Sequence, residues 1–82
     1  MLVNIKYFAS VREAIGTAGE ARQTSSETLE ALRDELVAQG PAYDCLGRSR
    51  AVRMALNHVM SAESSALTPG CEVAFFPPVT GG

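Results

Sequence analysis

The chain has 82 residues, so it forms one small domain near the lower size limit for a self-sufficient hydrophobic core. Its net charge is −2, from seven basic and nine acidic side chains, which argues against a nucleic-acid-binding protein because such proteins need a basic face. No apolar stretch approaches the roughly 20 residues of a membrane-spanning helix, and the first residues read directly as a strand. We therefore expect a soluble, cytoplasmic protein with no signal peptide and no membrane partner.

The first 25 residues predict a strand, a short helix and a second strand. Apolar residues alternate with polar ones in Leu2–Phe8, which is typical of a strand with one buried face. Ser10 is followed three residues later by Glu13, a capping-box pattern that predicts a short helix capped by Ser10. Gly16 is expected to end this helix, and residues 20–25 predict a polar strand at a sheet edge.

The clearest periodic pattern is a helix over Thr28–Gln39, capped by Ser26 or Thr28 and ended by Gly40. Its predicted core face carries three leucines, Leu29, Leu32 and Leu36. Three charged residues are expected to point outward from it, namely Glu30, Arg33 and Asp34.

The second half of the chain predicts three further strands. Residues 43–49 have no strong pattern and are expected to form a loop before a strand at Ala51–Leu56. Asn57-His58 predicts a tight turn into a short strand at Val59–Met60, and the last strand is expected at Glu72–Phe76. This order predicts an α+β fold, a mixed sheet packed on one main helix in the ubiquitin-like β-grasp arrangement. Residues 1–76 are expected to form this domain and residues 77–82 an extended tail.

The thiols and the imidazole of this chain form no recognisable chemical motif. Cys45 and Cys71 lack CxxC spacing and clustered histidines, so we expect no metal site and packing roles for both. His58 stands alone in a predicted turn, and no particular role is assigned to these three residues.

The segment that ends in Gly81-Gly82 is the most informative part of the sequence. It follows a predicted core strand and Pro77-Pro78, and two residues without side chains could enter a channel too narrow for any other residue. The alternative is a frayed end of no function. The sequence favours a carboxyl terminus that is inserted into another protein and used chemically there.

Three segments carry a resemblance to a known family: Phe8–Glu13, Thr28–Leu32 and Leu67–Gly82. Together they resemble the small subunit of molybdopterin synthase, the MoaD type, from end to end except over residues 40–50. The related ThiS-type carriers of thiazole synthesis share Gly81-Gly82 but lack the approach through Phe75-Phe76-Pro77-Pro78.

The resemblance implies a sulfur carrier for molybdenum cofactor synthesis. An ATP-dependent activating enzyme of the MoeB type would adenylate Gly82, and sulfur would then displace AMP to leave a thiocarboxylate. The charged chain would dock on a large subunit of the MoaE type, in a heterotetramer, and donate sulfur to cyclic pyranopterin monophosphate. The chain itself would bind no cofactor, since ATP serves the activating enzyme, and the catalytic pocket would lie on the large subunit.

The resemblance also assigns roles to single residues. Gly82 would carry the reactive acyl group, and Gly81 would keep the segment before it narrow and flexible. The residues expected to contact partners are Phe8, Arg12, Phe75, Phe76, Pro77, Pro78, Val79 and Thr80. Because neighbouring strand residues face opposite sides, only one of Phe75 and Phe76 can enter the core. Arg12 could equally be a solvent-exposed residue of the short helix.

Two other functions use the same features. A ubiquitin-like protein modifier would be conjugated to lysines through Gly82 after the same adenylation, and a ThiS-like carrier would deliver sulfur to thiazole synthesis. A binding module with an inert tail is a third possibility.

Overall fold

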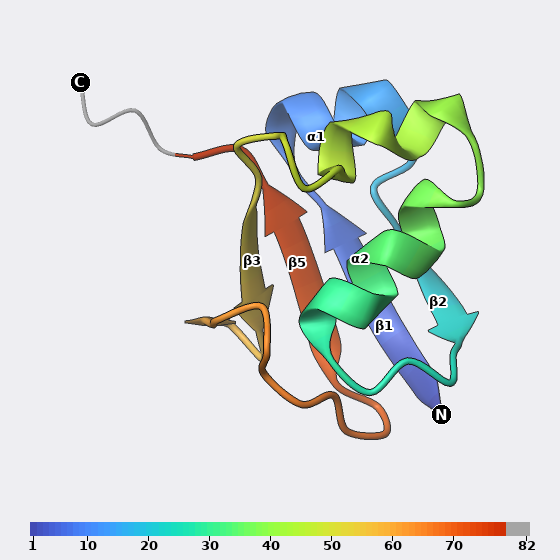
Figure 1. The fold of residues 1–82 in the computed structure, drawn as a ribbon, viewed down its shortest axis with the longest axis vertical. Coiled ribbons are helices and arrows are strands. Elements are labelled where there is room, and N and C mark those ends of the chain that lie inside the picture. Colours follow the sequence, from blue (N-terminus) through green and yellow to red (C-terminus); the bar gives the residue numbers. More distant parts are fainter. Residues whose placement is uncertain (79–82) are drawn as a thin grey trace.

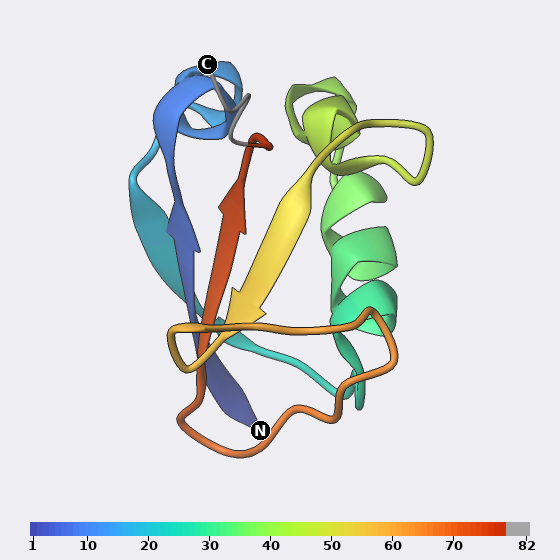
Figure 2. The same ribbon diagram turned by 90° about the vertical axis from the view of Figure 1, so that its left-hand side faces the viewer.

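The computed structural model describes residues 1–78 and shows one mixed sheet with the main helix and a 3₁₀ helix against one of its faces and a short helix at its end (Figures 1 and 2). The strands are β1 (Leu2–Tyr7), β2 (Gly19–Gln23), β3 (Arg53–Leu56), β4 (Val59–Met60) and β5 (Glu72–Phe76). The helices are α1 (Ala9–Ile15), α2 (Leu29–Val37) and the 3₁₀ helix η1 (Pro41–Leu46). The strand order is β2-β1-β5-β3-β4, in which only β1 and β5 run parallel. The predicted α+β class and edge position of β2 are confirmed.

The core lies between the sheet and α2. Strand β1 buries every second side chain, as the alternation predicts, and β5 does the same. The fully buried side chains are Val3, Ile5, Tyr7, Leu29, Leu32, Leu36, Leu46, Val73 and Phe75. The opposite face of the sheet carries no helix in the described part of the chain (Figure 2), and we call it the outer face.

Helix α1 follows β1 without the predicted capping box, so the prediction that Ser10 caps it is wrong. The N-cap is Phe8, in extended conformation with no side-chain cap, and its carbonyl oxygen accepts from the amides of Val11 and Arg12. The strand therefore passes straight into the helix and leaves no room for a polar cap at Ser10. Gly16 ends the helix in the left-handed region at φ 93°, as predicted, because glycine adopts that conformation without steric cost.

Helix α2 begins with Thr28, whose hydroxyl oxygen accepts from the amide of Ala31 at 3.2 Å. The prediction that Arg33 points outward is wrong, since this residue is 2% exposed. The segment between β4 and β5 covers it: the amide of Glu30 donates to the carbonyl of Glu63 at 2.9 Å, and that of Leu29 donates to Ser65. Helical periodicity identifies the leucine stripe but carries no information on a loop that packs against the neighbouring face.

Part of the predicted loop at 43–49 belongs to η1, which Pro41 begins. Proline suits the first position of a helix because its fixed φ is helical and its missing N–H would be unpaired there. Tyr43 packs edge-on against Tyr7 with ring centroids 6.4 Å apart, and Leu46 is fully buried. A single 3₁₀ segment has too few turns for a periodic pattern, so the sequence did not reveal it.

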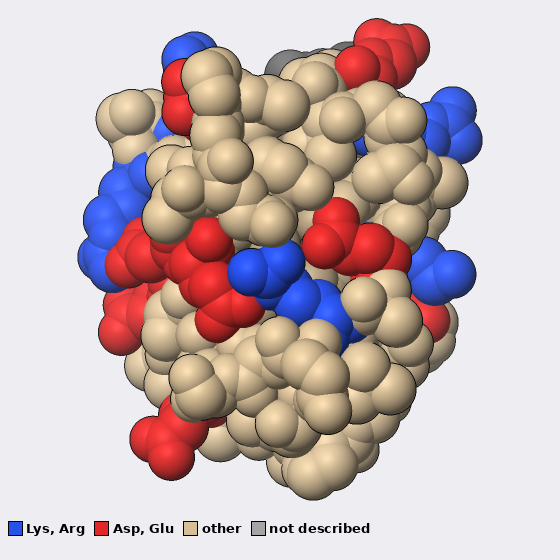
Figure 3. Space-filling view, turned by 90° about the vertical axis from the view of Figure 1, so that its right-hand side faces the viewer, with Lys and Arg blue, Asp and Glu red and all other residues tan. Residues whose placement is uncertain are grey.

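The side of the molecule that carries β2 and α2 is held by polar contacts (Figure 3). Glu35 of α2 accepts from Nε of Arg22, from Oγ1 of Thr24 at 2.6 Å and from Oγ of Ser26 at 2.8 Å. Acidic and basic side chains lie next to one another in a band across this face (Figure 3). These contacts fasten the edge strand to the main helix.

The β3–β4 hairpin has the predicted two-residue turn. Asn57 and His58 have φ values of 50° and 69°, the left-handed conformations that match the twist of a tight hairpin. Across residues 1–78, every helix is too short and too polar to traverse a lipid bilayer.

Candidate functional site

The last strand separates its two terminal aromatics onto opposite faces of the sheet. Phe75 is 0% exposed and stacks on Tyr7, with ring centroids 6.1 Å apart, so its prediction as a partner-binding residue is wrong. Phe76 is half-buried on the outer face, opposite Arg53 in the register of β5 and β3. The period of two along a strand accounts for this division. Phe76 is thus the aromatic available to a partner.

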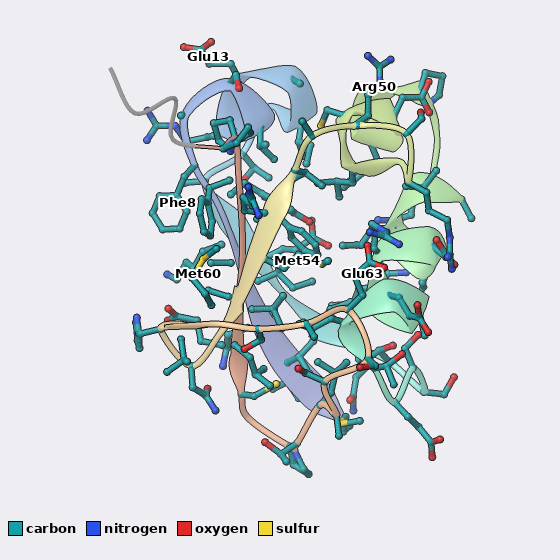
Figure 4. All side chains as sticks on the ribbon, turned by 60° about the vertical axis from the view of Figure 1, so that its left-hand side comes forward. Phe8, Glu13, Arg50, Met54, Met60 and Glu63 are labelled. Carbon is teal, nitrogen blue, oxygen red and sulfur yellow. The ribbon has the colours of Figure 1, made fainter. Side chains whose placement is uncertain are left out.

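An apolar patch extends from Phe76 over the outer face. Phe8 continues β1 beside it, since the amide of Phe8 donates to the carbonyl of Phe75 at 3.1 Å. The register pairs Ala74 with Ala55, and Ala55 with Met60, so these three residues share the face of Phe76. Figure 4 shows Phe8 and Met60 on the same side of the sheet. We call the set the outer patch: Phe8, Ala55, Met60, Ala74 and Phe76.

The outer patch has small side chains at its centre and large, exposed side chains at its periphery. Ala55 is 8% exposed and Ala74 is half-buried, so the centre consists of methyl groups and backbone. Phe8 and Met60 are 49% and 59% exposed, which is unusual for large apolar side chains. A partner that covers this face would remove both from water, so the patch is a candidate interaction surface.

Basic side chains border the outer patch. Arg53 lies opposite Phe76, Lys6 lies opposite Ala74, and both are exposed. Arg12 is exposed on α1, the helix that follows Phe8, and so keeps its place as a candidate partner contact. Glu72, two residues before Ala74 in β5, shares this face, so the border carries a negative charge as well as positive ones.

Sequence reasoning missed Ala55, Met60 and Ala74. Within β5, the sequence could have predicted that Ala74 shares the face of Phe76, because alternate residues of a strand face the same side. The contributions of β3 and β4 depend on strand pairing between distant segments, and no local pattern reveals that register.

Two residues of the predicted tail, Pro77 and Pro78, belong to the described part of the chain. Pro77 and Pro78 follow β5 directly and are both half-buried. The site residues Val79, Thr80, Gly81 and Gly82 lie outside the described residues. Their roles remain predictions from the sequence.

The other candidate groups do not gather into a site within residues 1–78. No three of their histidine, cysteine and acidic side chains come together as metal ligands, and no pocket opens on their surface. Cys71 is buried in the core, as expected for a packing residue, and burial raises the pKa of the Cys45 thiol. His58 is exposed, with Nε2 3.3 Å from a carboxylate oxygen of Glu72.

Two tyrosines converge on one carboxylate beneath the helices. The hydroxyls of Tyr7 and Tyr43 each donate to Oε2 of Glu20 at 3.2 Å. Burial, followed by the negative charge of Glu20, raises the pKa of Tyr7 well above its ordinary value. Both phenols therefore stay protonated and act as fixed donors that hold η1 against β1 and β2, at the end of the sheet where β5 ends (Figure 1).

A mixed sheet with this strand order and one main helix on one of its faces is the ubiquitin-like β-grasp arrangement. A sequence model described as the ThiS family matches residues 5–82, and the chain belongs to that family. Two relatives are each named molybdopterin synthase sulfur carrier subunit. The one from Escherichia coli is 37% identical and that from Haemophilus influenzae 35% identical, and both alignments cover 99% of this chain and 100% of the relative.

Solved structures confirm the β-grasp arrangement. SAMP1 from Haloferax volcanii superposes with a TM-score of 0.81 at 27% identity, covering 100% of both chains. A chain from the protein–protein complex of subunits 1 and 2 of the molybdopterin-converting factor of Helicobacter pylori gives a TM-score of 0.70, again over 100% of both chains. That second pair is 20% identical, so it supports the fold alone.

Proposed function

We propose that this chain is the sulfur-carrier subunit of a molybdopterin synthase. The observation that carries the proposal is the similarity at 37% and 35% identity to two carriers of that name, matched over their whole length. An alignment over the whole length of both relatives supports a common mode of action better than the identity alone, because the alignment includes the C-terminal segment. The outer patch supplies the docking surface that such a subunit needs.

The chemistry of the carrier resides in the carboxyl group of Gly82. A carboxylate is a poor electrophile, so an ATP-dependent activating enzyme first joins it to AMP, which makes one of its oxygens part of a good leaving group. A sulfur nucleophile then attacks the carbonyl carbon and expels AMP, leaving a thiocarboxylate. Gly81 has no side chain to obstruct the approach to the carbonyl carbon. ATP is bound by the activating enzyme, and the carrier holds no cofactor of its own.

Sulfur delivery takes place in the active site of the larger partner. The outer patch docks on the large subunit, while the segment from Pro77 to Gly82 reaches about 20 Å, at roughly 3.3 Å per residue, into that subunit's pocket. Pro77 and Pro78 stiffen its start and reduce the entropy lost on insertion. The thiocarboxylate sulfur then bonds to a carbon of cyclic pyranopterin monophosphate, and water attacks the carbonyl carbon of Gly82 and breaks its bond to sulfur. The carboxylate that results returns for recharging, in the cytoplasm, where Cys45 and Cys71 stay reduced.

Copurification and intact-mass analysis test this function together. The tagged chain, expressed with a large synthase subunit, is expected to copurify with it, and chain taken from cells with an activating enzyme is expected to carry sulfur in place of one oxygen. Reconstitution of molybdopterin from cyclic pyranopterin monophosphate completes the test. A chain that gains sulfur but yields no molybdopterin with the large subunit would refute the assignment and leave the thiazole-type carrier.

A protein modifier is the second candidate, favoured by the TM-score of 0.81 to Haloferax volcanii SAMP1, a protein that its name describes as a small archaeal modifier. In that case Gly82 forms isopeptide bonds with lysines of other proteins. A ladder of heavier adducts in the same cells, lost on deletion of Gly82, identifies this use.

A further inference from the structure

The chain contains a single lysine, Lys6, against six arginines. This ratio matters for a protein whose own carboxyl group is activated, because an amine attacks an acyl-adenylate whereas a guanidinium stays protonated. The other amine among the described residues, the α-amino group of Met1, donates to the carbonyl of Thr24 at 2.8 Å and is partly buried. Lys6 is therefore the exposed amine that an activated carboxyl group of this protein can meet on its own surface.

The fold places Lys6 beside the origin of the tail. Lys6 lies opposite Ala74 in the parallel register of β1 and β5, two residues before Phe76, where β5 ends. Neighbouring strands are about 4.8 Å apart and two strand residues span about 7 Å at right angles to that, so the backbone of Lys6 lies roughly 8 Å from the end of β5. Six residues from Pro77 to Gly82 span at most about 20 Å, which exceeds this separation.

The surroundings of Lys6 leave its amine accessible. On one side Lys6 is paired with Ala74 of β5, which is paired in turn with Ala55 of β3, and both side chains are single methyl groups. On the other side Lys6 is paired with Gly19 of β2. Among residues 1–78 no carboxylate forms an ion pair with Lys6. The three arginines Arg48, Arg22 and Arg33, in contrast, are paired with Asp34, Glu35 and Glu63. The approach to Lys6 is thus open from the solvent side.

From this placement we propose that Nζ of Lys6 is an acyl-acceptor site for the activated carboxyl group of Gly82, used when no sulfur donor is present. The inference rests on the proposed function, which supplies the acyl-adenylate. Nζ, after releasing a proton to solvent, attacks the carbonyl carbon, the bond to the AMP oxygen breaks, and an isopeptide bond forms. Relative to the free chain the product has lost one water molecule, and AMP leaves with the bonding electrons.

The same placement predicts when the reaction stops. Lys6 borders the outer patch, so a large subunit docked there covers the amine as well as Phe8 and Met60. Sulfur competes for the same carbonyl carbon while the chain is free. Acylation of Lys6 is therefore a side reaction of the free, sulfur-starved carrier, and it removes the carboxyl group from further cycles.

The test uses the full chain with an ATP-dependent activating enzyme and Mg-ATP, without a sulfur donor, followed by intact-mass measurement and peptide mapping. The expected product is linked between Gly82 and Lys6. A chain lighter by one water indicates attack by its own lysine, and two chains minus one water indicate a second copy; either product linked at Lys6 supports the site. Linkage at Met1, or equal yield from the Lys6→Arg variant, would overturn it.

A separate readout keeps the two proposals distinguishable. Exchange of pyrophosphate into ATP reports adenylation of Gly82, and addition of a sulfur donor reports thiocarboxylate formation. If both occur at the wild-type rate in Lys6→Arg and the isopeptide product is lost, the acceptor site is established. If both occur in the wild type without any isopeptide product, the acceptor site is wrong and the carrier function stands. Absence of exchange refutes the carrier function instead.

Discussion

Nη1 of Arg33, on α2, donates to Oε1 of Glu63 at 2.5 Å, across the boundary between the main helix and the segment that joins β4 to β5. The arginine side chain is 3% exposed and the glutamate side chain 52%. Among residues 1–78, Nε and Nη2 of Arg33 have no hydrogen-bond partner. Besides Asp34, whose Oδ1 lies 3.9 Å from Nε, the buried cation thus depends on a carboxylate that is itself half in water.

This asymmetry predicts unequal effects of the two single substitutions. Glu63→Gln leaves the buried charge with the more distant, half-exposed carboxylate of Asp34. It is expected to lower the free energy of unfolding by about 1–2 kcal/mol, less than for a fully buried pair because Glu63 is partly solvated. Arg33→Met removes the charge and keeps the volume, so we expect a change near zero. Urea unfolding of both variants and the double variant measures this. A double variant less stable than Glu63→Gln alone would contradict the explanation.

Phe75 and Phe76 offer a matched pair for separating stability from docking. Phe76→Ala is expected to leave the melting temperature almost unchanged and to weaken binding of the large subunit about tenfold or more, the effect of removing an interface anchor. Phe75→Ala opens a cavity in the core and is expected to cost about 3–5 kcal/mol of stability. Calorimetric titration and thermal unfolding distinguish the two. Unaltered binding by Phe76→Ala would exclude the outer patch as the docking surface.

The stability of the fold below neutral pH depends on Glu35. Burial disfavours its charged form, but hydrogen bonds from Thr24, Arg22 and Ser26, with the charge of Arg22, lower its pKa below the ordinary value of 4.5. A carboxyl group whose pKa is lower in the folded state stabilises the fold above its unfolded pKa, and this contribution is lost as pH falls through the folded value. Glu35→Gln is expected to be less stable at pH 7 and to lose less stability between pH 7 and acidic conditions. Parallel pH dependences for both proteins would show that Glu35 contributes nothing.

The sequence predicted those features of the fold that arise from short-range patterns. The alternation in β1, the leucine stripe of α2, the Thr28 cap and the Asn57-His58 turn all follow from neighbours within a few residues. Burial of Arg33 depends on a segment about 30 residues away, and no local pattern contains it. The same limit applies to the outer patch, where Met60 joins Phe8 only through the pairing of four strands. The alternation of strand residues predicts that Phe75 and Phe76 face opposite sides of the sheet. It does not predict which of the two faces α2.

Gly81 provides the most direct test of the carrier mechanism. Gly81→Ala adds one methyl group next to the reactive carboxyl group, so we expect the fold to be unchanged, and adenylation and sulfur transfer to fall by at least tenfold through obstruction of a narrow partner channel. Thr80→Ala is the comparison, because it makes a neighbouring partner-contact residue smaller, and its loss of activity is expected to be less than that of Gly81→Ala. Pyrophosphate exchange and single-turnover sulfur transfer measure the two steps separately. Wild-type rates for Gly81→Ala in both steps would show that the absence of a side chain before Gly82 is not what the partners require.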